Sequence, residues 1–432
     1  MPHELNSRDP GFEAAFAAFL EIKREAAADV SGVVAAILAR VRAEGDAALL
    51  ALTAELDRVE LTPAMLRLDA AEIESAWRQT PAELRRALEL AAERIEAFHR
   101  RQLPDDLAFD DAHGNRLGYR WRPVPAVGLY VPGGQAAYPS SVLMNALPAR
   151  VAGVPRVAMV VPAPEGLLSP VVLAAARLAG VDEIYRIGGA QAIAALAFGT
   201  ETVAPVDKIV GPGNAYVAEA KRQLFGQVGI DMIAGPSEIL VAADGAANPD
   251  WIAADLLSQA EHDASAQAIL ITDDAGFAAR VGAAVAGQLA TLPRAGVAAE
   301  SWARHGAVIV VADLMGEAPA LIDRIAPEHL ELAVAEPEAL AARVSNAGAI
   351  FLGPLTPEAV GDYVAGPNHV LPTGRSARFS SGLSVLDFLK RTSLIRCSAE
   401  GLAAIGPAAV RLAEVEGLPA HAASVARRLE RD

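Results

Sequence analysis

The spacing of apolar residues changes along this chain, and the change predicts where its helices and strands lie. In the first hundred residues, apolar positions recur every three or four residues, as in 29–44 and 81–102, which predicts amphipathic helices. Pro81 begins the second of these segments, in the first helical turn, where proline is tolerated. Apolar runs of strand length follow at 117–121 and 126–131.

From residue 130 onwards, runs of strand length alternate with helical segments in two series, 130–236 and 237–352. Strands that alternate with helices across short loops form a parallel sheet with helices packed on its faces. The last fifty residues, 383–432, again have helical spacing. The pattern therefore predicts an α/β fold with two parallel-sheet domains flanked by helices.

We predict four regions from these changes of pattern. Residues 1–28 form a small N-terminal helical extension, and 383–432 form a small C-terminal helical extension. The first α/β domain combines 29–129 with 237–382, and the second comprises 130–236. Each boundary falls where the spacing of apolar residues changes.

Composition narrows the class of protein. Hydrophobic residues make up 53% of the 432 residues, which excludes intrinsic disorder, and aromatic residues only 5%, so small aliphatic side chains fill most of the predicted core. No apolar run approaches the roughly 18 residues of a membrane-spanning helix, and the N-terminus carries no apolar signal segment. We therefore expect a cytoplasmic protein without a membrane partner.

Charge and cysteine content exclude further classes. The net charge is −16, from 53 acidic and 37 basic residues, and no cluster of Lys and Arg stands out. Since nucleic-acid binding needs such clusters to displace counterions, we expect no nucleic-acid partner. The single cysteine, Cys397, excludes an internal disulfide and a zinc site built from cysteines.

Three glycine-rich segments, at 130–134, 188–191 and 211–214, each follow a predicted strand and precede a predicted helix. Backbone N–H groups at such positions face an anionic ligand such as a pyrophosphate. None of the three matches the Gly-x-Gly-x-x-Gly dinucleotide fingerprint, so tight turns that need positive φ remain the alternative interpretation.

Two pairs of polar residues are candidates for chemistry. Gln259 and His262 are three residues apart near the end of a predicted helix, a spacing that suits two metal ligands or a histidine stabilised by the helix dipole. Glu328 and His329 are adjacent just before a strand. Adjacent residues in extended chain point to opposite sides, so the two would act as separate bases, unless both are simply exposed in a loop.

Two further pairs add possible metal ligands. Asp362 and His369 lie in a turn-rich stretch, where the aspartate is either a ligand or part of an Asx turn. Glu416 and His421 flank a predicted helix start. Together the candidates supply nitrogen and oxygen ligands without cysteine, which is more typical of a catalytic than of a structural zinc site.

Seven motifs in a fixed order make the sequence, from about residue 30 to its C-terminus, similar to the histidinol dehydrogenase family. They are GLYVPGG at 128–134, GGAQAIA at 188–194, GPGN at 211–214, GPSE at 235–238, LLSQAEH at 256–262, PEHL at 327–330, and GDY at 361–363 with NHVLPT at 368–373.

The resemblance implies a set of site residues. Family members hold one zinc per subunit, and the ligand positions match Gln259, His262, Asp362 and His421. The two catalytic bases match Glu328 and His329, and His369 is also close to the site. The substrate-binding positions match Ser237, Gln259, His262, His329, Asp362, Glu416 and His421. The positions that bind NAD match Tyr130, Gln191 and Asn214.

The resemblance also implies an architecture and a reaction. The family is a homodimer with two incomplete Rossmann-like domains, here with 130–236 on the NAD side and 29–129 combined with 237–382 on the zinc and substrate side. Its C-terminal segment reaches the partner subunit, so that Glu416 and His421 would complete the partner's site. The implied reaction oxidises L-histidinol through L-histidinaldehyde to L-histidine with two NAD, the last steps of histidine biosynthesis.

Two other classes share parts of the pattern. A zinc-dependent hydrolase uses His, Asp and a nearby Glu with an activated water, but needs neither NAD nor glycine-rich loops. A ligand-binding α/β module shares the loops but needs no metal and no base. NADH absorbance after mixing the protein with histidinol and NAD distinguishes both from a dehydrogenase.

Overall fold

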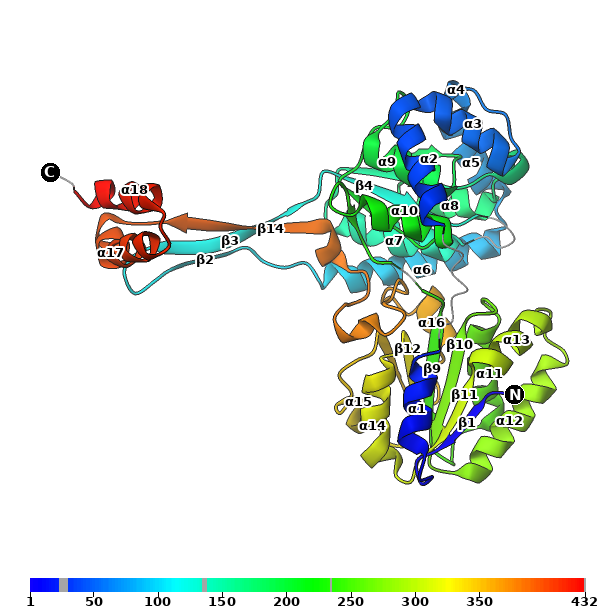
Figure 1. The fold of residues 1–432 in the computed structure, drawn as a ribbon. Helices are drawn as coiled ribbons and strands as arrows, with labels where there is room; N and C mark the ends of the chain where they lie inside the picture. Colours follow the sequence, from blue (N-terminus) through cyan, green and yellow to red (C-terminus); the bar gives the residue numbers. More distant parts are fainter. Residues whose placement is uncertain (23–29, 134–137, 234, 431–432) are drawn as a thin grey trace.

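A computed structural model describes residues 1–22, 30–133, 138–233 and 235–430. Two α/β lobes lie one above the other in Figure 1, and a long arm projects from the junction between them. None of the described helices combines the length and the apolar composition that crossing a membrane requires.

The upper lobe contains a parallel five-stranded sheet with strand order β6-β5-β4-β7-β8. Its strands are β4 (Ala126–Tyr130), β5 (Arg156–Val160), β6 (Glu183–Tyr185), β7 (Lys208–Val210) and β8 (Gly229–Ile230). The chain starts at the central strand, builds outwards on one side, and then returns to the other side of β4. This is the doubly wound order of a dinucleotide-binding domain with its sixth strand missing, as expected for an incomplete Rossmann-like unit.

Side chains alternate across this sheet and bury both of its faces. Val127 and Leu129 of β4 pack into one apolar cluster, while Ala126 and Tyr130 pack into another. The helices between the strands cover these faces: α7 (Pro139–Val151), α8 (Pro170–Leu178), α9 (Gly189–Phe198) and α10 (Ala215–Leu224), with the short η1 (Pro164–Gly166) before α8. The alternation of strands and helices predicted for 130–236 is therefore present.

The helices of residues 31–100 also pack on this lobe. They are α2 (Ser31–Glu44), α3 (Asp46–Asp57), α4 (Pro63–Leu66), α5 (Ala70–Gln79) and α6 (Ala82–Arg100). Asp69 and Glu72 form a capping box that starts α5, and the two helices predicted at 29–44 and 81–102 correspond to α2 and α6, although Asp29 lies outside the described residues.

Their packing contradicts the grouping of 29–129 with 237–382. Val34 and Leu38 of α2 join the cluster of Leu196 in α9, and Ile95 of α6 joins the cluster of Val142 in α7. The apolar stripes of these helices match the faces of the five-stranded sheet, a contact that their own periodicity does not specify.

The lower lobe contains a parallel six-stranded sheet with strand order β1-β11-β10-β9-β12-β13. Its strands are β1 (His3–Asn6), β9 (Glu238–Ala243), β10 (Gln267–Thr272), β11 (Ala307–Val310), β12 (His329–Ala333) and β13 (Ala349–Leu352). Without β1, its order repeats that of the upper sheet, so the two lobes share a topology that no sequence repeat indicates. The surrounding helices are α1 (Phe12–Leu20), α11 (Pro249–Ala260), α12 (Ala275–Leu289), α13 (Ala295–His305), α14 (Leu314–Ile325), α15 (Pro337–Ala341) and α16 (Glu358–Tyr363).

The predicted N-terminal helical extension, 1–28, is instead part of this lobe where it is described. His3 to Asn6 pair in parallel with Ala307 to Val310 at the sheet edge. Phe16 of the following helix is fully buried in the cluster that contains Leu321 of α14. Four residues without apolar alternation make a strand only because β11 offers an unpaired edge.

The C-terminal region, 383–432, is also not purely helical. It contributes an eight-residue strand, β14 (Leu389–Arg396), which pairs antiparallel with β3 (Arg116–Pro123). β2 (Leu107–Asp110) pairs with the other edge of β3, so the predicted strand 117–121 belongs to this arm and not to a lobe. The helices α17 (Ala399–Val415) and α18 (Pro419–Leu429) complete the tip of the arm, far from both lobes in Figure 1.

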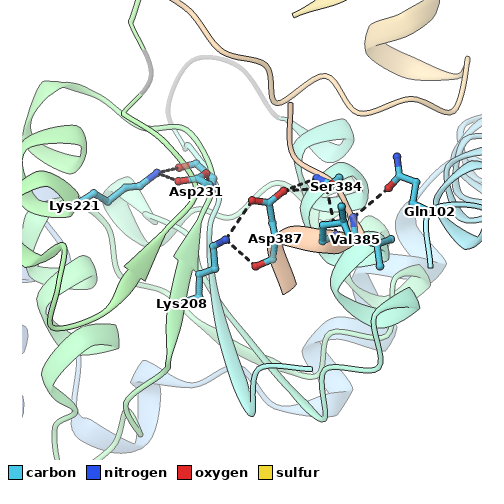
Figure 2. Close-up of polar contacts among 9 residues, drawn as sticks. Gln102, Lys208, Lys221, Asp231, Ser384, Val385 and Asp387 are labelled. Atoms are coloured by element: carbon cyan, nitrogen blue, oxygen red, sulfur yellow. Dashed lines mark hydrogen bonds and ion pairs between the residues drawn. The ribbon is translucent and has the colours of Figure 1, made fainter. Parts of the chain in front are cut away.

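Polar contacts fasten the base of the arm to the upper lobe, as Figure 2 shows. The ammonium of Lys208, at the start of β7, donates to the carbonyl oxygen of Asp387 at 2.7 Å and lies 3.3 Å from its carboxylate. Asp387 lies in a short 3-10 helix, η3 (Val385–Phe388), and forms a capping box with Ser384, whose backbone N–H donates to the Asp387 carboxylate. The backbone N–H of Val385 donates to Gln102, just after α6. A further short 3-10 helix, η2 (Ser376–Arg378), precedes η3 in the chain.

We predict that Lys208→Met lowers the urea midpoint of unfolding, because it removes two charge-assisted hydrogen bonds at a site where the lysine side chain is 15% exposed. A loss of about 1–3 kcal/mol is expected for such bonds. Arg280→Met is the matched control, because Arg280 and Asp274 form a 3.9 Å ion pair that is about half exposed and contributes little. Equal midpoints for Lys208→Met and the wild type, at one protein concentration, would contradict the prediction.

Candidate active site

A cluster of polar residues that includes Glu238, Glu328 and His329 lies at the amino ends of β9 and β12, two adjacent strands of the lower sheet. Glu238 begins β9 and His329 begins β12, and His329 is in register with Ile239. Doubly wound sheets bind ligands at the carboxyl ends of their strands, so this location departs from the general rule. The α11 helix follows β9 and runs back along the sheet, which brings its last turn, with Ser258 and Gln259, to the same edge.

Glu238 and Glu328 bind each other's backbone. The N–H of Glu238 donates to the Glu328 carboxylate at 2.9 Å, and the N–H of Glu328 donates to the Glu238 carboxylate at 3.3 Å. Glu238 also accepts from the N–H of Gly374 at 3.0 Å. These contacts fix the direction of the Glu328 side chain, and burial raises the pKa of Glu328 to about 8.

His329 is held with a defined orientation of its ring. Its Nδ1 lies 2.9 Å from the carbonyl oxygen of Glu238, and because a carbonyl only accepts, Nδ1 carries a proton. Its Nε2 faces Glu358 Oε1 at 3.6 Å and Asp362 Oδ1 at 3.7 Å. Burial alone would lower the pKa of His329, but the carboxylates of Glu328, Asp362 and Glu358 raise it to about 10.

The expectation that Glu328 and His329 point to opposite sides is wrong. The carboxylate of Glu328 lies 3.7 Å from Nδ1 of His329. Glu328 precedes the first residue of β12, so strand alternation does not apply to it, and its side chain turns towards the N–H of Glu238. The two side chains still have different neighbours, because Glu328 contacts the backbone of Glu238, whereas Nε2 of His329 faces Glu358 of α16.

Glu358 is a site residue that the sequence reasoning missed. It lies four residues before Asp362 on α16, a spacing that places both carboxylates on one face of the helix and would have indicated the pair. Burial and the charge of Asp362 raise the pKa of Glu358 to about 7. For Asp362, burial is outweighed by the neighbouring imidazoles of His329, 3.7 Å away, and His369, which hold its pKa at about 2. Ser258 donates to Glu358 at 3.3 Å.

Gln259 and His262 meet at the end of α11, as their spacing predicts, with 3.4 Å between Gln259 Nε2 and His262 Nδ1. Burial lowers the pKa of His262 and favours the neutral imidazole that metal ligation requires. His369 lies beside them and contacts the carbonyl oxygen of Asp362 through Nδ1 at 2.9 Å. The backbone of Ser237, just before β9, accepts from the N–H of Gln267.

The cluster has the properties of a cation site. Within the part of the chain that the structure describes, His329, Glu358 and Asp362 present ligand atoms within 4.8 Å of one another. Three buried atoms in this cluster have no hydrogen-bond partner among the described residues: Oε1 of Gln259, Oε1 of Glu358 and Nε2 of His329. Buried polar atoms are rarely left unpaired, and a dication would supply the two oxygen atoms with a partner, while Nε2 of His329 is left to face a ligand.

Two of the expected site residues do not join this cluster within one chain. Glu416 ends α17 and His421 lies in α18, both exposed at the tip of the arm. The chain therefore brings together Gln259, His262 and Asp362 of the four expected metal ligands, and leaves His421 apart.

The expected NAD-binding residues lie at the carboxyl edge of the upper sheet. Tyr130 ends β4, and its hydroxyl accepts from the N–H of Gly189 at 3.2 Å. Gln191 is buried in α9, and its Oε1 has no partner among the described residues. Asn214 caps α10 by accepting from two backbone N–H groups. Gly189 and Gly211 have φ values of +63° and +111°, so both turns also need glycine for conformational reasons. Gly134 lies outside the described residues.

Known proteins match this chain over nearly its whole length. The family model for histidinol dehydrogenase matches residues 20–429. The histidinol dehydrogenase of Rhodospirillum rubrum is 66% identical over 431 residues, 100% of this chain and 99% of that protein. That of Rhizobium meliloti is 63% identical over 429 residues, 99% of each.

A solved structure also matches the fold of this chain over nearly its whole length. The crystal structure of histidinol dehydrogenase from Elizabethkingia anophelis has a TM-score of 0.95 and 37% sequence identity, and the match covers 99% of this chain and 98% of the other. The chain belongs to the histidinol dehydrogenase family.

Proposed function

We propose that this chain oxidises L-histidinol through L-histidinaldehyde to L-histidine with two NAD. The observation that carries the proposal is the setting of His329, a buried imidazole with one nitrogen fixed by Glu238 and the other facing a carboxylate cluster. Beside it, Glu328 is a second, separately oriented base. The family to which the chain belongs supports the reaction.

One zinc ion per subunit is proposed for the cluster. Gln259, His262 and Asp362 of one subunit would hold it together with the partner subunit's His421. The unpartnered Oε1 of Gln259 and the neutral state favoured at His262 support this assignment. Bound there, zinc would orient the substrate by taking its imidazole and amino nitrogens.

In the first oxidation, His329 accepts the proton of the carbinol hydroxyl through Nε2 as a hydride leaves the carbon for NAD. His329 is a base only when neutral, and a zinc ion held at Asp362 would lower the pKa of His329 from about 10 towards that state. The carbonyl of Glu238 keeps the proton on Nδ1 and leaves the lone pair on Nε2.

In the second oxidation, Glu328 accepts a proton from a water that adds to the aldehyde carbon, and His329 returns the proton it took up in the first oxidation to the carbonyl oxygen, which gives the gem-diol and a neutral His329. His329 then accepts a hydroxyl proton as hydride leaves for a second NAD, and the acid is formed. A buried carboxyl with a raised pKa suits the base of this step, since it is basic enough near neutral pH.

Tyr130, Gln191 and Asn214 are proposed to bind NAD. The three lie around the point where the strand order of the upper sheet reverses, between β4 and β7, which is where such sheets bind dinucleotides. The unpartnered Oε1 of the buried Gln191 supports a ligand there, and the N-termini of α9 and α10 favour its phosphates.

A homodimer with shared sites is proposed, in which Glu416 and His421 complete the site of the partner, where they bind substrate with Ser237. The projecting arm supports this, because Ile395, Leu412 and Val415 are 65–75% exposed in one chain, and apolar side chains so exposed favour an interface. A biosynthetic enzyme that draws on NAD fits the cytoplasm, which we propose as its location.

The direct test of the function is the absorbance of NADH after histidinol and NAD are mixed with the full-length protein. Two NADH per histidinol are expected. A hydrolase or a binding module gives none, and one NADH per histidinol would limit the proposal to the first oxidation.

We predict that His262→Asn and His421→Asn each lose bound zinc and most activity while the fold is retained, because each removes one nitrogen ligand. Elemental analysis of the purified variants, with circular dichroism for the fold, measures both. His3→Asn is the control, since His3 lies on the distant edge strand β1 and should keep its zinc. Full zinc content in either site variant would remove that histidine from the metal site.

We predict that two inactive variants complement each other in mixed dimers. A Glu328→Gln/His329→Asn chain supplies an intact His421 to a His421→Asn chain, which contributes intact bases, so each mixed dimer holds one complete site. Random reassociation should restore about a quarter of the wild-type activity. Absence of activity in mixed dimers that are shown to form would argue for sites contained within one chain.

We predict that Glu328→Gln separates the two oxidations. The amide keeps the size of the side chain but removes the base, so oxidation of histidinaldehyde should slow by about 10²–10⁴, while the first oxidation remains near normal. His329→Asn should slow both steps. Rapid-mixing measurement of NADH with histidinol and with histidinaldehyde distinguishes them, and equal slowing of both substrates in Glu328→Gln would falsify the division of roles.

A further inference from the structure

A buried ion pair lies directly beneath one of the glycine-rich turns of the upper lobe. Lys221 of α10 and Asp231, just after β8, pair with side chains that are only 4% and 1% exposed. Figure 2 shows the two side chains pointing toward each other. Neither residue belongs to the proposed zinc or substrate site, which is built on the other lobe.

The ion pair forms hydrogen bonds with both the C=O and the N–H of Gly211. The ammonium of Lys221 donates to the carbonyl oxygen of Gly211 at 3.0 Å, and the N–H of Gly211 donates to the carboxylate of Asp231 at 2.7 Å. Gly211 directly follows β7, where the ladder of strand hydrogen bonds ends. Its backbone is therefore fixed by two charged side chains from two different elements.

Gly211 is also confined from the opposite side. Its φ is +111°, and a Cβ atom built on it would lie 2.1 Å from the carbonyl oxygen of Tyr130 at the end of β4. The turn that starts at Gly211 therefore fits between β4 and the Lys221–Asp231 pair. This is the point where the strand order reverses and where a dinucleotide is expected.

General stability is a poor explanation for such a pair. Removing two charges from water costs several kcal/mol per ion, and a buried pair is often no more stabilising than apolar side chains of similar volume. Since the ion pair completes the hydrogen bonds of one particular turn, its specific effect is to define the position of that turn. Asn214 and the start of α10 follow Gly211 by three and four residues and move with it.

We propose that Lys221 and Asp231 are positioning residues for NAD, which hold the Gly211–Asn214 turn in the shape that binds the cofactor. The inference rests on the proposed function in one respect, namely that this turn contacts NAD. Neither side chain is itself assigned a contact to the cofactor, since each is buried and engaged with the other and with Gly211.

The test compares NAD binding in Lys221→Met, Asp231→Asn and the wild type. Isothermal titration of the full-length, zinc-containing enzyme with NAD should show a Kd at least about tenfold higher in both variants, because a small displacement of a binding group is costly. Zinc content and the Kd of histidinol should stay at wild-type values. In steady state, KM for NAD should rise more than kcat falls.

Arg156→Met is the matched control. Arg156 and Glu183 form a second, partly buried ion pair in the same sheet, with side chains 27% and 14% exposed, but at the amino end of β5, away from the glycine-rich turns. Arg156 also donates to the carbonyl oxygens of Ala204 and Pro205. Its loss should lower the thermal midpoint of unfolding and leave the Kd of NAD unchanged.

Each outcome decides the proposal. Wild-type NAD affinity in folded Lys221→Met and Asp231→Asn overturns it, and so does an equal loss of affinity in Arg156→Met, which would mean general destabilisation. If Lys221→Met does not fold, Asp231→Asn decides alone, because it keeps the size of the side chain and removes the charge that holds Lys221 at the carbonyl oxygen of Gly211. Failure of the wild type to bind NAD would overturn the proposed function instead, since the positioning role presupposes that binding.

Discussion

The burial of His329 among carboxylates is the constraint on which the rest of the candidate active site depends. Glu328, Glu358 and Asp362 all lie within 4 Å of its ring nitrogens. Charged groups are costly to bury unless each is paired, hydrogen-bonded or bound to a metal. Two of the buried carboxylates are hydrogen-bonded within the cluster, because Glu238 and Glu328 each accept from the backbone N–H of the other.

A second layer of carboxyl groups continues the same pattern. Glu331 follows His329 by two residues on β12, on the same side of the strand, and is 1% exposed. Burial and the neighbouring charge of Asp255 raise its pKa to about 9, so this carboxyl is neutral at neutral pH. The negative charge of the site is thereby limited to the groups nearest His329, and the unpartnered atoms that face the cluster interior leave room for a cation.

The two lobes share one topology but carry their distinctive residues at opposite edges of the sheet. In the upper sheet, glycine-rich turns follow β4, β6 and β7 at the carboxyl edge, as in other doubly wound folds. In the lower sheet, the polar residues stand at the amino ends of β9 and β12 instead. Segment 364–388 contacts both lobes, because Asn368 donates to the carbonyl of Met144 in the upper lobe and the N–H of Gly374 donates to the carboxylate of Glu238 in the lower lobe.

Local spacing was enough to predict the elements whose pattern is local. The α6 helix, the alternation of strands and helices after residue 130, and the contact of Gln259 with His262 all follow from residues a few positions apart. The ordered motifs were enough to predict the family. Only the tertiary structure decided that β1 joins the edge of a sheet 300 residues away, that α2 to α6 pack on the upper lobe, and that β14 forms an arm with β3. The same holds for Glu358, which becomes a site residue only because α16 packs beside His329. Strand pairing and helix docking join surfaces distant in sequence, and the periodicity of one segment carries no record of its partner.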